Sequence, residues 1–190
     1  LLVTTCHGQI NDIYNQAAAV HDLESVEHVL LWKTAYYSFI NPLQFGAIVA
    51  GAPHKALTAL ADYGIAAGRA FQISDDIIGL FGDPHETGKS SLDDLREGKR
   101  TLLILKALEQ ANPDDAAFLD AQLGNSQLTE NDFKRARQII RNCGALDYAN
   151  AELVVSCDQA KQALQNEALP DSDGTRFLRG LADYLKERRS

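Results

Sequence analysis

The chain has 190 residues, 45% of them hydrophobic, with a formal net charge of −8 and a pI near 5.0. This size suits one domain, over residues 1–190, or part of a larger one. The acidic balance argues against nucleic-acid binding, which needs a basic face, and the apolar runs are too short for a transmembrane segment. The three cysteines form neither a zinc pattern nor a disulfide framework, which favours a cytoplasmic location.

The first segment, residues 1 to about 20, is predicted to be a helix. Gln9 and Asp12 are three residues apart in it and therefore share one face. This spacing fits two polar residues on a wet surface as well as part of a site. The chain begins with neither an initiator Met nor a signal pattern. We therefore expect it to be the later part of a longer protein.

A second helix is predicted to begin at Ser25, which is a favourable N-cap residue. Lys33 falls on the apolar stripe of this helix by the i, i+3, i+4, i+7 rule. It is either an ammonium that reaches outward from the edge of the stripe or one aimed into a cavity that holds an anion. Residues 41–42, an Asn-Pro pair, are predicted to interrupt the helix, because proline disfavours helical geometry at the preceding residue. A short helix over about residues 43–50 follows.

A long helix is predicted over about residues 54–81. Gly64 and Gly68 are small and allow a neighbouring helix to approach closely. Asp75 and Asp76 continue two adjacent stripes of this helix, one of them apolar. A carboxylate there is costly unless it is paired or bound to a metal, and negative charge near a helix C-terminus opposes the macrodipole. A bound cation would remove both costs, although two ordinary surface acids remain an alternative.

Residues 82–98 are predicted to be a loop rich in Gly, Asp, Ser and Pro. The loop contains Asp83 and Lys89, and Lys99 follows it at the start of the next helix. Further helices are predicted after Asn112 and after the N-cap residue Thr129, and the last helix ends in basic residues that complement its dipole. Because no segment shows strand alternation, the sequence predicts an all-α fold.

Paired carboxylates near lysines suit a diphosphate bridged by a metal. Mg²⁺ keeps several waters and is usually held by one or two carboxylates together with substrate phosphates. Loss of diphosphate requires stabilisation of the developing negative charge, which metals and ammonium groups supply. The carbocation left behind needs a largely apolar cavity without water. An all-helical bundle with acids pointing inward provides both environments.

Four motifs, in this order, resemble those of the trans-isoprenyl diphosphate (polyprenyl) synthases, of the bacterial geranylgeranyl or farnesyl diphosphate synthase type. The resemblance covers residues 1 to about 105 and is to the C-terminal part of such proteins. It implies an isoprenoid synthase-type helical bundle around a central cavity, with the N-terminal helices outside this chain. The motifs are Gly8-Gln9-x-x-Asp12, Lys33-Thr34-Ala35-x-Tyr37-Ser38, Phe71-Gln72-x-x-Asp75-Asp76, and Gly88-Lys89-x-x-x-Asp93-Asp94 with Glu97-Gly98-Lys99-Arg100-Thr101.

The resemblance implies a Mg²⁺-dependent, head-to-tail condensation of isopentenyl diphosphate with an allylic diphosphate, which releases diphosphate. The matching positions imply that Asp75 binds Mg²⁺ directly and that Asp76 helps through a water. Gln9 and Asp12 would line the cavity. The resemblance also implies a homodimer.

The same resemblance assigns the polar contacts of the substrate. Lys33 and Lys89 would hold the allylic diphosphate, and Lys99 would close the loop over it. Gln72 and Thr34 would face the allylic cation, Thr34 through its carbonyl or its hydroxyl.

Two departures from the family pattern stand out. The usual DDxxD sequence would place an acid at position 79, where this chain has Gly79. Asp83, one helical turn further, is our candidate for the missing metal ligand, directly or through a water. The family's first DDxxD motif lies upstream of the Gly-Gln motif and is absent here, so half of the metal site is expected outside this chain.

Two other functions stay open. A non-catalytic subunit of a heteromeric prenyl synthase would share the fold, although the intact lysines and aspartates speak against it. A class I terpene cyclase shares both the fold and the Mg²⁺-diphosphate chemistry. The segment at residues 98–101 and the Gly-Gln motif favour the synthase.

Overall fold

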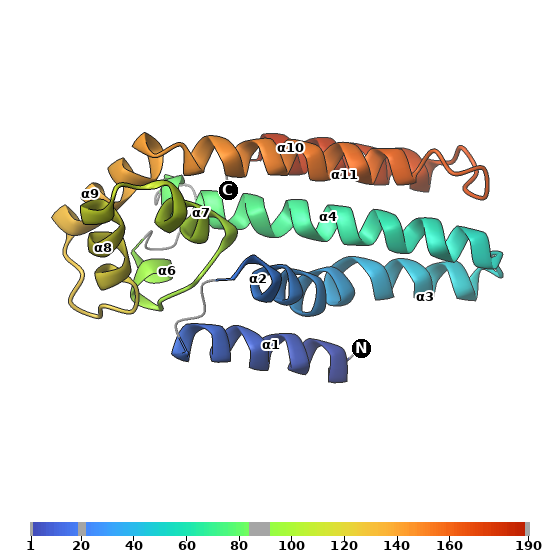
Figure 1. The fold of residues 1–190 in the computed structure, drawn as a ribbon. Coiled ribbons are helices and arrows are strands. Elements are labelled where there is room, and N and C mark those ends of the chain that lie inside the picture. Colours follow the sequence, from blue (N-terminus) through green and yellow to red (C-terminus); the bar gives the residue numbers. More distant parts are fainter. Residues whose placement is uncertain (1, 19–21, 84–91, 189–190) are drawn as a thin grey trace. The chain divides into compact units, whose positions relative to one another are not determined.

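The computed structural model describes residues 2–18, 22–83 and 92–188, and every regular element in these ranges is helical. The prediction of an all-α fold is confirmed. The helices are α1 (Leu2–Ala17), α2 (Leu23–Val29), η1 (Leu30–Ile40), α3 (Asn41–Val49), α4 (His54–Phe81), α6 (Asp93–Arg96), α7 (Leu102–Gln110), α8 (Pro113–Gln122), α9 (Glu130–Asn142), α10 (Ala145–Ala163) and α11 (Asp173–Glu187) (Figure 1).

The chain divides into two compact units, and α1, α2, α4 and α10 each contribute residues to both. The prediction of a single domain therefore stays a prediction. None of the described helices is long and apolar enough to cross a membrane. Of the described residues, the first unit contains 2–11, 27–74 and 152–188, and the second contains 12–18, 22–26, 75–83 and 92–151.

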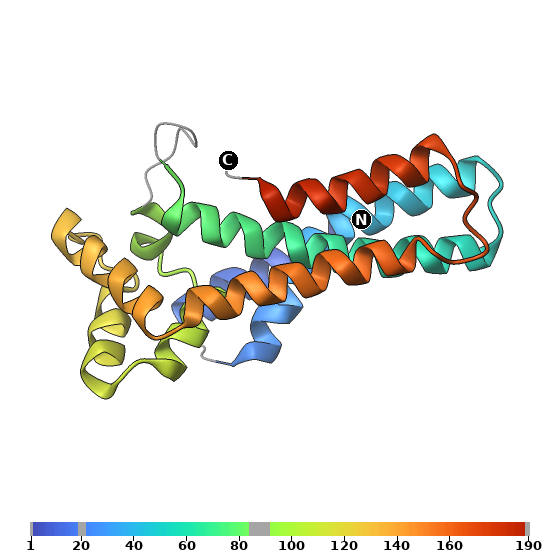
Figure 2. The same ribbon diagram turned by 90° about the horizontal axis from the view of Figure 1, so that it is seen from above.

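Helix α4 lies at the centre of the first unit, with α10 and α11 running alongside it (Figures 1 and 2). Tyr63 of α4 is fully buried, and its hydroxyl donates to the carbonyl of Leu178 in α11 at 2.8 Å. Burial raises the pKa of Tyr63, so this hydroxyl keeps its proton. Arg69 of α4 donates to Oγ of Ser156 in α10 at 2.8 Å and pairs with the carboxylate of Glu27 at the same distance.

The residues from Leu30 to Ile40 form a π-helix, a form that is rare beyond a single turn and is frequent at functional sites. Helix α4 packs against it backbone to backbone. A Cβ atom at Gly68 would lie 2.6 Å from the Cα of Ala35, and one at Gly64 would lie 3.0 Å from the Cα of Ile40. The close approach predicted for these two glycines is therefore confirmed, and it fixes η1 on α4.

Two predicted helix boundaries before residue 50 are wrong. Helix α2 begins before Ser25, because the Asp22 side chain accepts hydrogen bonds from the Ser25 backbone at 2.7 Å and hydroxyl at 2.9 Å. These bonds lower the pKa of Asp22. The Asn-Pro pair does not interrupt the helical structure, since Asn41 is helical (φ −65°, ψ −44°) and α3 follows η1 directly. Pro42 falls in the first turn of α3, where proline is tolerated.

In the second unit, α7, α8 and α9 lie close together (Figure 2). Thr129 is the N-cap of α9 and accepts a hydrogen bond from the backbone of Asp132 at 3.2 Å, as predicted. Helix α7 begins slightly later than predicted, because Thr101 is its N-cap and accepts from the backbone of Ile104 at 3.3 Å. The polar caps therefore determine where these helices start.

Replacing Gly68 by Ala is expected to lower the free energy of unfolding by about 1–3 kcal/mol, because the new methyl group would overlap the backbone of Ala35. Gly46 of α3 provides the matched control, since it has no neighbouring atom within 4 Å of its would-be Cβ. There, alanine should raise stability by up to about 1 kcal/mol through helix propensity. Urea denaturation measures both. A Gly68→Ala variant as stable as the wild type would contradict the backbone packing.

Candidate functional site

The π-helix η1 carries two predicted site residues, Lys33 and Thr34. Thr34 is only 8% exposed, and its hydroxyl donates to Oε1 of Gln72 in α4 at 2.9 Å. Lys33 is half-buried, and its backbone lies against α1, where a Cβ atom at Gly8 would be 2.8 Å from the Lys33 Cα. Within the first unit, backbone packing therefore brings Gly8 next to Lys33, and a hydrogen bond joins Thr34 to Gln72.

The polar pair of α1 is less enclosed. Gln9 is exposed, and Asp12 is half-buried. Oδ1 of Asp12 accepts a hydrogen bond from Nε2 of Gln16, one turn along the helix, at 3.2 Å. The cavity-lining role of both residues stays a prediction.

The two acids of α4 differ in burial. Asp76 is 7% exposed, whereas Asp75 is exposed, and Asp83, beyond the end of α4, is also exposed. The expectation that both helical acids lie on buried stripes is therefore wrong for Asp75. Consecutive residues of an α-helix point about 100° apart, so two neighbours can differ in burial as Asp75 and Asp76 do.

Within the described ranges, no three Asp, Glu, His or Cys side chains lie close enough together to hold a metal ion. One or two carboxylates on a helix nevertheless suit Mg²⁺, which takes its other ligands from water and substrate phosphates. The donor set at Asp75 and Asp76 fits that chemistry. The metal role of these two residues and of Asp83 stays a prediction.

Lys99 precedes α7, and its ammonium pairs with two carboxylates. Its Nζ atom contacts Oδ1 of Asp94 and lies 3.1 Å from Oε2 of Glu97. Burial lowers the pKa of Lys99, but the hydrogen bonds and charges of Asp94 and Glu97 outweigh this effect, and the net shift is upward. Lys99 is therefore a stable cation. Lys89 lies outside the described residues.

Arg188, which follows α11, is not among the site residues that the sequence predicted. Its Nε donates to Oγ of Ser74 at 2.8 Å, and its Nη2 donates to the carbonyl of Phe71 at 3.1 Å. The guanidinium carbon also lies 4.5 Å from the centre of the Phe71 ring. These contacts fix a cation on the turn of α4 that carries Gln72. The basic residues at the end of the chain were the only sequence feature that could have indicated a role for Arg188. The same pattern is also explained by the dipole of the last helix.

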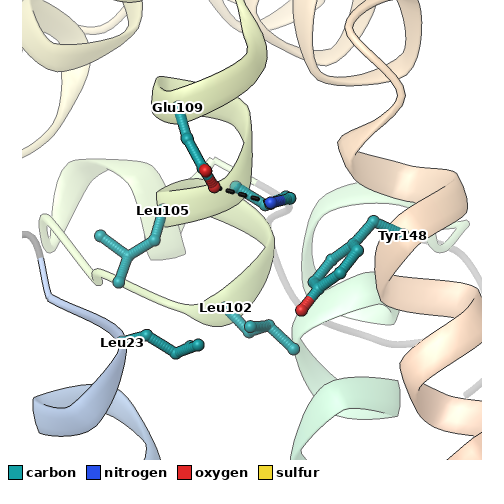
Figure 3. A pocket seen from close by; sticks show the side chains of 6 residues that line it. Leu23, Leu102, Leu105, Glu109 and Tyr148 are labelled. Carbon is teal, nitrogen blue, oxygen red and sulfur yellow. Dashed lines mark hydrogen bonds and ion pairs between the residues drawn. The ribbon is translucent and has the colours of Figure 1, made fainter.

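A small pocket of about 150 Å³ opens in the second unit (Figure 3). Its cation, Lys106, is paired with Glu109 at 2.7 Å and lies 4.8 Å from the centre of the Tyr148 ring. None of the predicted site residues lines this pocket, so we assign it no part in the site. The lining residues are Leu23, Leu102, Leu105, Lys106, Glu109 and Tyr148.

The chain matches the polyprenyl synthetase family model over residues 1–140. A geranylgeranyl diphosphate synthase of Sulfolobus acidocaldarius is 39% identical over 189 residues, covering 99% of this chain and 56% of that protein. A geranylfarnesyl diphosphate synthase of Aeropyrum pernix is 38% identical over 145 residues, covering 76% of this chain and 44% of that protein. The chain spans about half the length of the curated relatives it matches.

Solved structures show the same similarity. A geranylgeranyl pyrophosphate synthase of Corynebacterium glutamicum, complexed with isoprenyl diphosphate and magnesium, has a TM-score of 0.91 at 35% identity, covering 98% of this chain and 52% of that one. A Caulobacter crescentus polyprenyl synthase, complexed with calcium and isoprenyl diphosphate, has a TM-score of 0.87 at 34% identity, covering 98% and 56%. The family model matches well over half of the length of this chain, which therefore belongs to the polyprenyl synthetase family.

Proposed function

We propose that this chain is part of a Mg²⁺-dependent prenyltransferase that joins isopentenyl diphosphate to an allylic diphosphate and releases diphosphate. The observation that carries the proposal is Asp76, a carboxylate only 7% exposed within about two turns of the C-terminus of α4. Burial and the helix dipole both raise the free energy of a negative charge there, and a divalent cation offsets both. The magnesium and isoprenyl diphosphate in the Corynebacterium glutamicum structure support the same assignment.

When bound, Mg²⁺ neutralises the oxygens of the leaving diphosphate. Asp75 would hold the ion directly and Asp76 through a water, and Asp83 would supply the acid that is missing at position 79. Gln9 and Asp12 would line the cavity around the hydrocarbon chain.

The substrate diphosphate would be held by Lys33 and Lys89, and Lys99 would close over it. The bond between the allylic carbon and its oxygen breaks, and the double bond of isopentenyl diphosphate attacks the cation. A proton then passes to the released diphosphate. The Thr34 hydroxyl donates a hydrogen bond to Oε1 of Gln72. The lone pairs of the Thr34 oxygen therefore remain as an electron-rich surface for the cation.

A homodimer and a cytoplasmic location belong to the same proposal. The family resemblance supports the first, and the absence of a disulfide pattern among the cysteines supports the second.

The proposal predicts that the purified protein, given Mg²⁺, isopentenyl diphosphate and geranyl or farnesyl diphosphate, forms a longer prenyl diphosphate. Product analysis and diphosphate release are the measurements, and EDTA should stop both. A cyclase would release diphosphate from the allylic substrate alone, and a non-catalytic subunit would release none from either mixture. Each of these two outcomes would overturn the proposal.

Replacing Thr34 by Val should lower kcat/KM by about tenfold, because it removes the hydroxyl that donates to Gln72 and, in this proposal, faces the cation. A hydrogen bond of this kind contributes about 0.5–1.5 kcal/mol. Thr34→Ser keeps the hydroxyl and is the matched control, for which we expect a loss below about threefold. Steady-state kinetics with both variants is the measurement. Equal losses in the two variants would exclude a role for the hydroxyl.

Replacing Asp83 by Ala should shift the Mg²⁺ titration of activity to higher concentration by about tenfold, as expected for the loss of one carboxylate or water-mediated contact. Asp114, an exposed acid in the first turn of α8, is the control for lost surface charge. Its replacement by Ala should leave the titration unchanged. An unaltered titration in the Asp83 variant would rule out its metal role.

A further inference from the structure

A carboxylate from a distant segment of the second unit lies against α4 at position 79. A Cβ atom added at Gly79 would overlap Oδ2 of Asp94 and would lie 3.4 Å from its Cγ. No L-residue larger than glycine fits there without displacing this side chain. The family pattern places an acid at position 79, and here an acid occupies the adjacent space from the segment at residues 92–100.

The same carboxylate holds Lys99. Oδ1 of Asp94 contacts the Lys99 ammonium, and the backbone N–H of Lys99 donates to the Asp94 carbonyl at 3.1 Å. Glu97 also contacts Lys99, but its side chain is 59% exposed, against 25% for Asp94. Since an exposed pair contributes little, Asp94 is the partner that determines where the ammonium lies.

The opposite side of this segment is anchored independently. The N–H of Gly124 donates to the carbonyl of Leu95 at 2.8 Å, and Nη2 of Arg96 donates to the carbonyl of Leu128 at 2.9 Å. Gly98 has a φ of +72°, and a Cβ atom there would lie 3.2 Å from the Gly124 nitrogen. These contacts hold the segment at Leu95, Arg96 and Gly98. The contact between Asp94 and Gly79 holds it separately against α4.

We propose that Asp94 is the positioning residue for Lys99, and that Gly79 leaves room on α4 for the Asp94 carboxylate. The proposal rests on the proposed function, in which Lys99 closes over the substrate diphosphate. In this arrangement Asp94 acts through the ammonium group of Lys99. It holds the ammonium in place before the diphosphate arrives, which reduces the ordering that binding requires.

The effect of Gly79→Ala separates this proposal from an ordinary helical glycine. Alanine in a helix interior normally raises stability because its helix propensity is higher. If Gly79 only lowers the stability of α4 through its poor helix propensity, the variant is more stable and its Kd for diphosphate is unchanged. If Gly79 receives Asp94, the new methyl group displaces the carboxylate, and Lys99 moves with it.

The test measures two quantities in the intact protein: the Kd for inorganic diphosphate with Mg²⁺, by calorimetry, and kcat and KM for the allylic substrate. Gly79→Ala and Asp94→Asn should each raise Kd and KM by about fivefold, the effect of losing one partly exposed ion pair, and kcat should change less. The double variant should resemble either single one, because both act through one carboxylate. In a variant that already carries Lys99→Gln, adding Asp94→Asn should raise Kd and KM no further.

Two controls separate this effect from general changes in charge and helix stability. Asp93→Asn removes a neighbouring exposed acid, and Gly180→Ala changes a helical glycine of α11 with no atom within 4 Å of its would-be Cβ. Both should stay within about twofold of the wild type. If Gly79→Ala folds poorly, Asp94→Asn, which adds no volume, decides the question.

The outcomes distinguish this proposal from the proposed function. An active wild type whose Gly79 and Asp94 variants keep wild-type Kd and KM would overturn the positioning role alone. Multiplying effects in the double variant would also overturn it. A wild type that forms no prenyl product, but whose diphosphate affinity falls as described in both variants, would overturn the proposed function and uphold the positioning of Lys99.

Discussion

Backbone-to-backbone packing of η1 against α4 is the contact on which the first unit depends. Gly64 and Gly68 remove the side chains that would hold the two helices apart. At this separation the short side chain of Thr34 reaches Gln72 directly. A wider spacing would break this hydrogen bond, whose loss matters most for the buried Thr34 hydroxyl. The glycines and the polar pair therefore form one arrangement, in which each is explained by the other.

The second unit uses a glycine differently. At Gly79 the missing side chain makes room for a carboxylate, whereas Gly68 makes room for backbone. Asp94 can lie close to α4 because its charge is balanced by Lys99. A negative group near the C-terminal end of a helix would otherwise oppose the helix dipole. The ammonium is thus part of what allows the acid to occupy this position.

The sequence predicted the features that depend on local patterns. The all-α class, the bounds of α4 and the cap at Thr129 follow from periodicity and from single side chains next to helix ends. The family motifs also named Thr34 and Gln72 as residues of one site, and the structure brings them into contact. The confirmed predictions share a cause, since each depends on neighbours in sequence, whereas the site role of Thr34 and Gln72 stays a prediction.

The features that the sequence did not predict depend on contacts between distant segments. The π-helical form of η1 is a local exception, since 11 residues are too few to distinguish its i→i+5 period from that of an α-helix. Asp94 and Gly79, which are in contact, lie fifteen positions apart in the sequence, and no local sequence pattern connects them. As a consequence, this chain places a carboxylate beside position 79 from a residue that lies fifteen positions later in the sequence. A search pattern that demands an acid at position 79 would reject this chain, although the Asp94 carboxylate lies against α4 at that position. Positions 79 and 94 are therefore best compared among relatives as a linked pair.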